Sequence, residues 1–242
     1  MNQLQVSGLT KRFGGLTANL NIDVTVGDGE IVGLIGPNGA GKTTLFNCVA
    51  GIYRPEAGRV VFEGRDVTGW PPEKICRAGV ARTFQIVKSF GQMTVLENVM
   101  VGAFLHNARS AAARATAMEV LEFTGLAEKQ GMLARNLTIA DKKRLELTRA
   151  LATGPKFMML DEAMAGLTPK ETQEAVELIQ ALHDRGITIL LVEHVMEVVM
   201  PISDRIVVLE YGQKIAEGEP AQIARDERVI KAYLGVEYRA SS

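Results

Sequence analysis

The sequence has few cysteines, few aromatic residues and no long hydrophobic run. Its 242 residues include two cysteines, Cys48 and Cys76, and aromatic residues make up 5%. Two cysteines without metal-ligand neighbours cannot build a disulfide framework, so we expect a reducing compartment. The first residues lack the apolar core of a signal peptide, and no apolar run reaches about 18 residues. The sequence therefore predicts a chain that does not cross a membrane by itself.

An excess of charge of one sign is also absent. Lysine and arginine total 27, aspartate and glutamate total 28, and the formal net charge is −1. Nucleic-acid-binding domains usually carry a clear basic excess, so we expect no nucleic-acid partner. Hydrophobic residues make up 47%, which is enough to form a sizeable core. The length allows one large domain, or a core with a small subdomain.

Short apolar runs alternate with segments of helical character along most of the chain. Runs this short and apolar are typical of strands buried on both faces. The expected strands are 31–35, 80–84, 157–160 and 187–192, and the expected helical segments are 43–51, 71–78, 94–153 and 170–184. This alternation predicts an α/β fold with a mostly parallel sheet.

Two regions depart from this alternation. Near the N-terminus, VSGLTKRF, LNIDVTV and RVVFEG alternate apolar with polar residues between glycine-containing turns, which predicts a small antiparallel β subdomain. Residues 91–153 have few strand signals and lie between two expected core strands. We therefore expect an inserted helical subdomain at 91–153, with 1–90 and 154–242 forming the core and the antiparallel β subdomain.

The stretch GPNGAGKTT at 36–44 carries the strongest chemical signal. It matches G-x-x-x-x-G-K-[ST], and it follows an expected strand and precedes an expected helix, which is the context that a phosphate-binding loop requires. Glycines let successive backbone amides curl toward phosphate oxygens, and the helix adds its positive N-terminal end. A glycine-rich turn that binds nothing is the competing interpretation, and the flanking elements disfavour it. The predicted binding residues are Gly36, Pro37, Asn38, Gly39, Ala40, Gly41, Lys42, Thr43 and Thr44.

Within this loop, three side chains have distinct expected roles. Lys42 would contact the β- and γ-phosphates, the Thr43 hydroxyl would bind Mg²⁺, and Thr44 would donate to an α-phosphate.

Two carboxylates end the apolar run in FMMLDE at 157–162. Asp161 would hold Mg²⁺ directly or through water. Glu162, one residue later, would accept a proton from the attacking water. Alone, the pair would be better explained as solvated acids at a strand end. The phosphate loop in the same chain favours the catalytic interpretation.

Three further residues are weaker candidates. Gln85 ends one expected strand and could contact Mg²⁺ and orient water, and His194 follows another and could reach a γ-phosphate. Phe13 could stack on an adenine ring. Each also has an ordinary explanation: a polar loop residue, a structural histidine and an aromatic residue packed in the core.

Taken in order, these motifs resemble the ATP-binding subunit of an ABC transporter over nearly the whole chain. The resemblance implies a P-loop NTPase (RecA-like) core, with ATP and Mg²⁺ as cofactors. Several phrases are similar to the ATPase subunits of branched-chain amino-acid importers. They are KRFGGL (11–16), GPNGAGKTTLFN (36–47), RTFQIVKSFGQMTVLENVMVG (82–102), MAGLTP (164–169), VEHVMEVVM (192–200) and AYLG (232–235).

The resemblance assigns roles to matching positions. Phe13 would stack on adenine, and Gln85 would sense the γ-phosphate and report to the membrane subunits. Glu162 would be the catalytic carboxylate and His194 the switch histidine. Residues 163–169 would contact a partner ATPase, although Thr168 stands where many family members have aspartate, which puts one intersubunit hydrogen bond in doubt.

The stretch LTIAD at 137–141 occupies the signature position of the family but departs from its pattern. There, a helix opening with serine, two glycines and glutamine contacts the γ-phosphate of ATP on the opposite subunit. Thr138 keeps the hydroxyl, Ile139 and Ala140 lose the room that glycine gives, and Asp141 adds a negative charge. We expect Lys142, Lys143 and Arg144 to offset that charge. A weaker phosphate grip through Thr138 and a purely structural capped helix both remain open.

The sequence thus predicts the ATP-hydrolysing subunit of an importer for branched-chain or other hydrophobic amino acids. It would sit peripherally on the cytoplasmic face of the inner membrane with permease subunits, which would contact loop 86–92 and part of 93–105. Its second ATPase subunit would be a different chain or a second copy. The alternatives are a machine that extracts lipid or lipopolysaccharide, and a soluble ABC-type ATPase acting on nucleic acid or ribosomes. A GTPase is disfavoured because no Asn-Lys-x-Asp motif is present.

Overall fold

The computed structural model describes residues 2–84 and 88–239, with side chains described as far as residue 233. The chain forms two compact units, Met1–Ile75 with Thr188–Ser242, and Cys76–Ile187.

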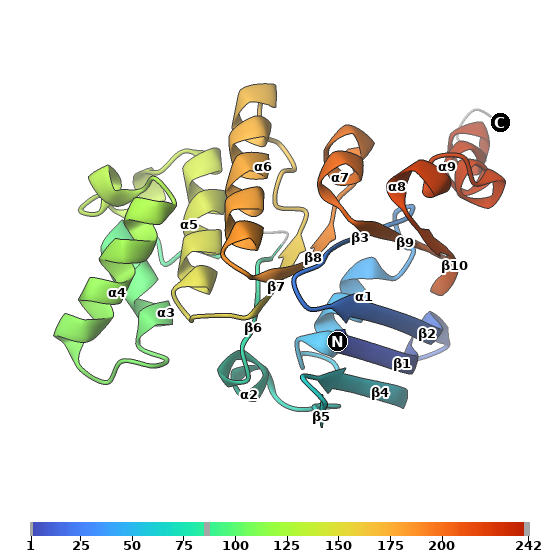
Figure 1. Cartoon of the computed structure of the whole chain (residues 1–242), viewed down its shortest axis with the longest axis horizontal. Coiled ribbons are helices and arrows are strands. Elements are labelled where there is room, and N and C mark those ends of the chain that lie inside the picture. The colour runs from blue at the N-terminus through green and yellow to red at the C-terminus, as the bar shows by residue number, and fades with distance from the viewer. Residues whose placement is uncertain (1, 85–87, 240–242) are drawn as a thin grey trace. The chain divides into compact units, whose positions relative to one another are not determined.

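The first unit contains the antiparallel sheet expected near the N-terminus. Its strand order is β2-β1-β4-β5, formed by β1 (Asn2–Phe13), β2 (Leu16–Gly27), β4 (Ala57–Phe62) and β5 (Arg65–Asp66). Neighbouring strands are antiparallel, as Figure 1 shows. Leu4, Val6 and Leu9 are buried on β1. The prediction of an antiparallel β subdomain is confirmed.

The first unit also holds strands β3 (Ile31–Ile35), β8 (Thr188–Val192), β9 (Arg205–Glu210) and β10 (Gln213–Gly218). β3 lies between β8 and β9 and is parallel to both, whereas β10 pairs antiparallel with β9. Every residue of β3 and β8 is buried, as their apolar sequences predicted. β9 and β10 were not predicted, because an apolar run as short as IVVL is equally compatible with a buried helix.

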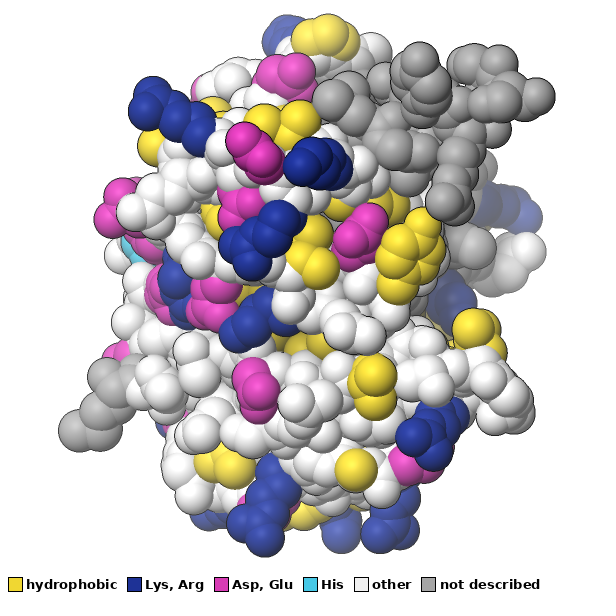
Figure 2. All heavy atoms as spheres, turned by 90° about the vertical axis from the view of Figure 1, so that its right-hand side faces the viewer, with side chains coloured by type: hydrophobic (Ala, Val, Ile, Leu, Met, Phe, Trp, Pro, Cys, Tyr) yellow, Lys and Arg dark blue, Asp and Glu magenta, His cyan; other side chains and the backbone are white. Residues whose placement is uncertain are grey.

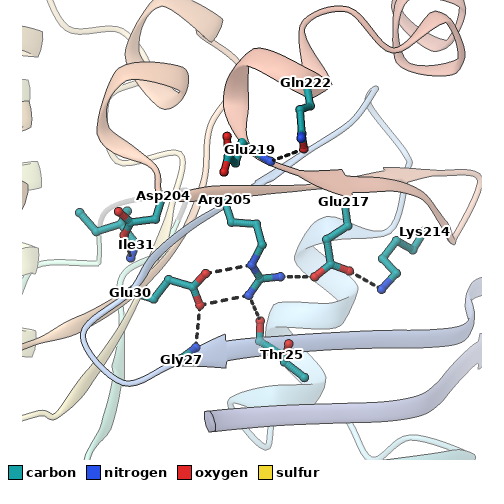
Figure 3. A network of polar contacts seen from close by, with 10 residues as sticks. All are labelled: Thr25, Gly27, Glu30, Ile31, Asp204, Arg205, Lys214, Glu217, Glu219 and Gln222. Atoms are coloured by element: carbon teal, nitrogen blue, oxygen red, sulfur yellow. Dashed lines mark hydrogen bonds and ion pairs between the residues drawn. The ribbon is translucent and has the colours of Figure 1, made fainter. Parts of the chain in front are cut away.

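Arg205 at the start of β9 ties together three strands of this unit (Figure 3). Its guanidinium bonds both carboxylate oxygens of Glu30, at 2.8 and 3.0 Å, and donates to the Thr25 carbonyl at 2.6 Å. It also pairs with Glu217 on β10. The helices of this unit are α1 (Lys42–Val49), α7 (Met196–Ile202), α8 (Pro220–Ile223) and α9 (Glu227–Arg239). The boundary between the units falls within α2 (Pro72–Arg77).

In the second unit, β6 (Val80–Arg82) pairs in parallel with β7 (Phe157–Asp161). The helices α3 (Val95–Ala103), α4 (Ser110–Phe123) and α5 (Ile139–Leu151) pack together, and α6 (Pro169–Asp184) follows β7 (Figure 1). The expectation of helix throughout 94–153 was wrong in two parts. Residues 104–109, between α3 and α4, form a turn and irregular chain. Between α4 and α5 the chain makes turns and two 3-10 helices, η1 (Ala127–Lys129) and η2 (Ala134–Asn136).

A left-handed glycine explains where this interruption begins. Gly125 has φ +71°, a conformation that ends a helix readily because glycine has no Cβ.

Across residues 2–84 and 88–239, none of the helices combines the length and the apolar character that a membrane-spanning helix needs.

Candidate functional site

The loop between β3 and α1 has the backbone that phosphate binding requires. Gly36, Gly39 and Gly41 have φ of +147°, +79° and +97°. A Cβ on Gly36 would lie 2.0 Å from the Leu209 carbonyl oxygen, and one on Gly41 would lie 2.4 Å from the Ala18 carbonyl oxygen. Both the conformation and the close packing therefore demand glycine at these positions. Only a loop curled in this way presents consecutive amides to an anion.

Lys42 directs its ammonium group into this loop. The side chain is buried, and its Nζ donates to the Gly36 carbonyl at 2.6 Å and the Pro37 carbonyl at 3.0 Å. Thr43 is exposed and Thr44 is half-buried at the start of α1. The loop therefore gathers a cation, two hydroxyl groups and a helix N-terminus, a set that matches a nucleotide's phosphates.

Tyr233 on α9 lies against the same loop. Its hydroxyl oxygen is buried and lacks a partner in hydrogen-bond geometry within the described part of the chain. Burial raises the pKa of Tyr233 to about 12, although the nearby Gly36 amide partly offsets this. The sequence offered AYLG only as a family phrase, and no local pattern indicated that this tyrosine would reach the phosphate loop.

The ring of Phe13 is 42% exposed, which rules out packing in the core. It meets Tyr53 edge to face, with ring centroids 5.1 Å apart, and the Lys11 Nζ lies 5.2 Å from its centroid. The ring is therefore open to a stacking partner.

His194 is exposed and follows β8 at its carboxyl end, next to the buried Glu193. Gln85, the third of the weaker candidates, lies outside the described residues.

In the second unit, the carboxyl ends of β6 and β7 place Arg82 beside Asp161. The sequence did not predict this ion pair. The Arg82 Nη2 lies 3.1 Å from the Asp161 Oδ2, and the two side chains are 9% and 1% exposed. The described residues hold no cluster of three or more histidine, cysteine, aspartate or glutamate residues that could bind a metal. A single buried carboxylate suits Mg²⁺, which is usually held by one or two carboxylates together with substrate phosphates.

Glu162 has an unusual backbone for a residue with a side chain. Its φ of +49° is left-handed, a conformation that costs about 1–2 kcal/mol for an L-residue. The Lys143 Nζ on α5 donates to its carbonyl oxygen at 3.0 Å. Such strain persists where the surrounding structure imposes it, and it is frequent at functional positions.

Thr138 caps α5, as the sequence predicted. Its Oγ1 accepts the Asp141 amide at 3.1 Å, and the hydroxyl lies 2.9 Å from the Asp141 Oδ2. Lys142, Lys143 and Arg144 were expected to offset the charge of Asp141. The field of Arg144 does help to lower the pKa of Asp141, but the ion pair comes from Lys129. The Lys129 Nζ pairs with Asp141 at 2.6 Å, whereas Lys143 bonds Glu162 and Arg144 bonds Glu174. No pattern in the sequence indicated this contact, because Lys129 lies in η1, 12 residues before Asp141.

The pKa of Asp141 reflects this neutralisation. Burial alone would raise it, but the hydrogen bonds from Lys129 and Thr138 outweigh burial, and the field of Arg144 adds to them. The pKa is lowered as a result, and the carboxylate stays charged but paired. Ile139 beside it is 67% exposed, a large apolar side chain at the open end of the helix.

Farther along α5, Glu146 and Arg149 form hydrogen bonds to the backbone of Phe84 and Lys88. The buried Glu146 accepts the Phe84 amide at 3.2 Å, and Arg149 donates to the Lys88 carbonyl at 2.8 Å. Arg149 also lies 5.2 Å from the centroid of the Phe90 ring. Burial raises the pKa of Glu146 and lowers that of Arg149. Neither Glu146 nor Arg149 was predicted from the sequence. The one signal in the sequence was that these two charged residues lie among the apolar positions of the helix.

Comparison with known proteins places these features in a family. A family model described as "ABC transporter" matches residues 20–165, and one described as "Branched-chain amino acid ATP-binding cassette transporter" matches residues 213–239. The chain is 46% identical to the high-affinity branched-chain amino acid transport ATP-binding protein LivG of Salmonella typhimurium, covering 96% of this chain and 97% of that protein. It is 43% identical to BraF of Pseudomonas aeruginosa, with the same coverage.

More distant proteins share the same layout. The lipopolysaccharide export system ATP-binding protein LptB of Escherichia coli is 33% identical over 99% of this chain and 100% of that protein. Among solved structures, the ADP conformation of an ATP-binding cassette of an ABC transporter superposes with a TM-score of 0.88. The two are 32% identical, and the match covers 97% of this chain and 99% of the other.

Proposed function

Since the chain belongs to the ABC transporter family of ATP-binding proteins, we propose that it powers the import of branched-chain amino acids. The observation that carries this assignment is its 46% identity to LivG over nearly the full length, together with the C-terminal match at 213–239. The lipopolysaccharide alternative rests on a relative that is 33% identical, and is correspondingly weaker.

The alternative of a nucleic-acid or ribosome partner has little support. On the face shown in Figure 2, basic and acidic side chains are interspersed, and neither sign forms a continuous patch. The formal net charge of the chain is −1. A surface that follows a phosphate backbone would need a basic stripe or groove.

Transport measured in cells tests the assignment. Deleting the gene should abolish high-affinity uptake of labelled leucine, isoleucine and valine, and the wild-type gene should restore it. Normal uptake combined with a defect in lipopolysaccharide at the cell surface would instead favour the extraction machine.

The residues of the two units support specific roles in ATP hydrolysis. The loop from Gly36 to Thr44 would bind the phosphates, with Lys42 as its cation, and Phe13 would stack on adenine. Thr43, Asp161 and Gln85 would hold Mg²⁺, which neutralises phosphate charge when bound. His194 would contact the γ-phosphate. Glu162 would orient the attacking water and take its proton as the water oxygen bonds to the γ-phosphorus and ADP leaves.

A docking face for the permease is proposed around Phe90. The rings of Phe90 and Phe104 are 47% and 46% exposed, and Val101 is 44% exposed. Leu96 and Val99, on the other side of α3, are buried within the unit. Exposed apolar side chains beside a loop are what a helix of a membrane subunit would cover, at the cytoplasmic face of the inner membrane.

Single cysteines placed at residues 88–92 should crosslink to a permease subunit in the assembled complex. The background would have both native cysteines, Cys48 and Cys76, changed to alanine. A cysteine at the exposed Glu122 on α4 is the matched control and should not crosslink. Equal or absent crosslinking at all positions would argue against this face.

The signature helix bears on the identity of the second ATPase subunit. In the family dimer each ATP lies between one subunit's phosphate loop and the other's signature helix. The side chains of Ile139 and Ala140 keep the ATP phosphates from approaching the backbone at the start of that helix as closely as glycines would allow. A second copy would supply the same weakened helix twice, so we propose that the chain works beside a different ATPase that retains the glycines.

Changing Ile139 and Ala140 to glycine and Asp141 to glutamine should raise the ATPase rate of the isolated chain. Because Lys129 already neutralises Asp141, most of the gain should come from the glycines. Two glycines in the first turn should also cost about 1–2 kcal/mol of stability. The measurement is ATPase rate against protein concentration, with Asp141→Gln alone as the control. A fast, steeply concentration-dependent wild type with no gain in the variant would contradict the proposal.

A further inference from the structure

The guanidinium of Arg82 lies against the carboxylate that the proposed function gives to magnesium. Its Nη2 is 3.1 Å from the Asp161 Oδ2, and both side chains are almost completely buried. A buried carboxylate needs a compensating cation, because taking its charge out of water without one is strongly unfavourable. Arg82 supplies that cation from within the chain.

The backbone fixes this placement. β6 and β7 pair in parallel with Arg82 opposite Met159, and the Thr83 amide donates to the Met159 carbonyl at 2.9 Å. The Asp161 amide donates to the Thr83 Oγ1 at 3.2 Å. The ion pair therefore joins the carboxyl ends of two hydrogen-bonded strands.

Arg82 also has favourable surroundings other than Asp161. Its guanidinium carbon lies 4.5 Å from the centroid of the Phe84 ring, a cation–π contact. Burial raises the pKa of Glu146, and the field of Arg82 is the smallest of several effects that oppose this rise. Glu146 accepts the Phe84 amide at the same time. A guanidinium that shifts away from Asp161 would thus retain an aromatic face.

We propose that Arg82 is a positioning residue that shares Asp161 with magnesium. It neutralises and orients the carboxylate before the metal arrives, and it yields at least one carboxylate oxygen to the ion that enters with ATP. This inference rests on the proposed function, in which Asp161 is a magnesium ligand. Its consequence is that Arg82 competes with the metal for the Asp161 Oδ2, which raises the magnesium concentration that ATP binding requires.

The test measures how much Mg²⁺ a labelled, non-hydrolysable ATP analogue needs for half-maximal binding to the full chain. Arg82→Gln should lower that concentration about tenfold, which is the order expected for losing one charge-assisted hydrogen bond that competes. Arg82→Lys keeps the positive charge and should return the value toward the wild type. An unchanged or raised magnesium requirement in Arg82→Gln would overturn the inference.

Two further variants separate the possible failures. Asp161→Asn should raise the magnesium requirement, and if it does not, the assignment of Asp161 in the proposed function is wrong. Arg205→Gln is the matched control, because Arg205 is likewise an arginine paired with carboxylates, Glu30 and Glu217 (Figure 3), but it holds strands of the first unit together. It should lower the unfolding temperature without changing the magnesium requirement.

A measurement on the wild type covers the case in which Arg82→Gln fails to fold. The side-chain ¹⁵N signal of Arg82, assigned from its loss in Arg82→Lys, should shift when Mg²⁺ and the ATP analogue are added together. It should stay in place when the analogue is added with EDTA. A signal that does not move with magnesium would mean that Arg82 keeps Asp161 throughout, and the inference would be wrong.

Discussion

Glu162→Gln should bind ATP with nearly unchanged affinity and lose at least about a hundredfold in turnover, because general bases contribute about 10²–10⁴ to rate. The amide has the same shape as the carboxylate but cannot take a proton from water. The backbone of Glu162 is already left-handed with its own side chain, and glutamine adds no further strain. Folding should therefore be preserved, and ATP-bound dimers should accumulate.

Steady-state hydrolysis and equilibrium ATP binding, measured on the same preparation, check this prediction. Glu177→Gln is a suitable control, because Glu177 is an exposed acid on α6. It should hydrolyse ATP at the wild-type rate. Turnover of Glu162→Gln within about threefold of the wild type would rule out Glu162 as the principal base.

Lys42→Ala should act at an earlier step and weaken ATP binding by about a hundredfold. The buried ammonium group lies inside the phosphate loop, where it donates to the Gly36 and Pro37 carbonyls. A charge-assisted hydrogen bond from it to a phosphate oxygen would contribute about 1.5–3 kcal/mol to ATP binding, which corresponds to about a tenfold to hundredfold change in affinity. Alanine removes the cation and also leaves the Gly36 and Pro37 carbonyls without this donor. The variant should therefore unfold at a slightly lower temperature even without nucleotide.

Nucleotide titration and thermal unfolding with and without Mg²⁺-ATP distinguish the two effects. The wild type should gain stability on adding Mg²⁺-ATP, because a ligand that binds only the folded state stabilises it. Lys42→Ala should lose most of that gain, whereas Lys74→Ala, which removes an exposed lysine of α2, should retain it. Wild-type ATP affinity in Lys42→Ala would contradict the assignment of the phosphate loop.

The sequence by itself determined the α/β class, the antiparallel sheet and the strand–loop–helix unit from Ile31 to Val49. These features depend on local rules, namely apolar runs, alternation and glycine spacing, which are legible in short windows. The cap of α5 by Thr138 was legible for the same reason, since it joins residues three apart. The capping box of Thr168 on α6 has the same spacing but was not predicted.

Only the tertiary structure decided which distant side chains meet. The pairing of Arg82 with Asp161 joins residues 79 apart, through a parallel ladder whose register the sequence does not specify. Lys129 rather than a neighbour on α5 neutralises Asp141, because the turn after Gly125 returns the chain to that helix end. Tyr233 reaches the phosphate loop from the last helix. Such contacts are set by packing and chain reversal, which no local pattern encodes.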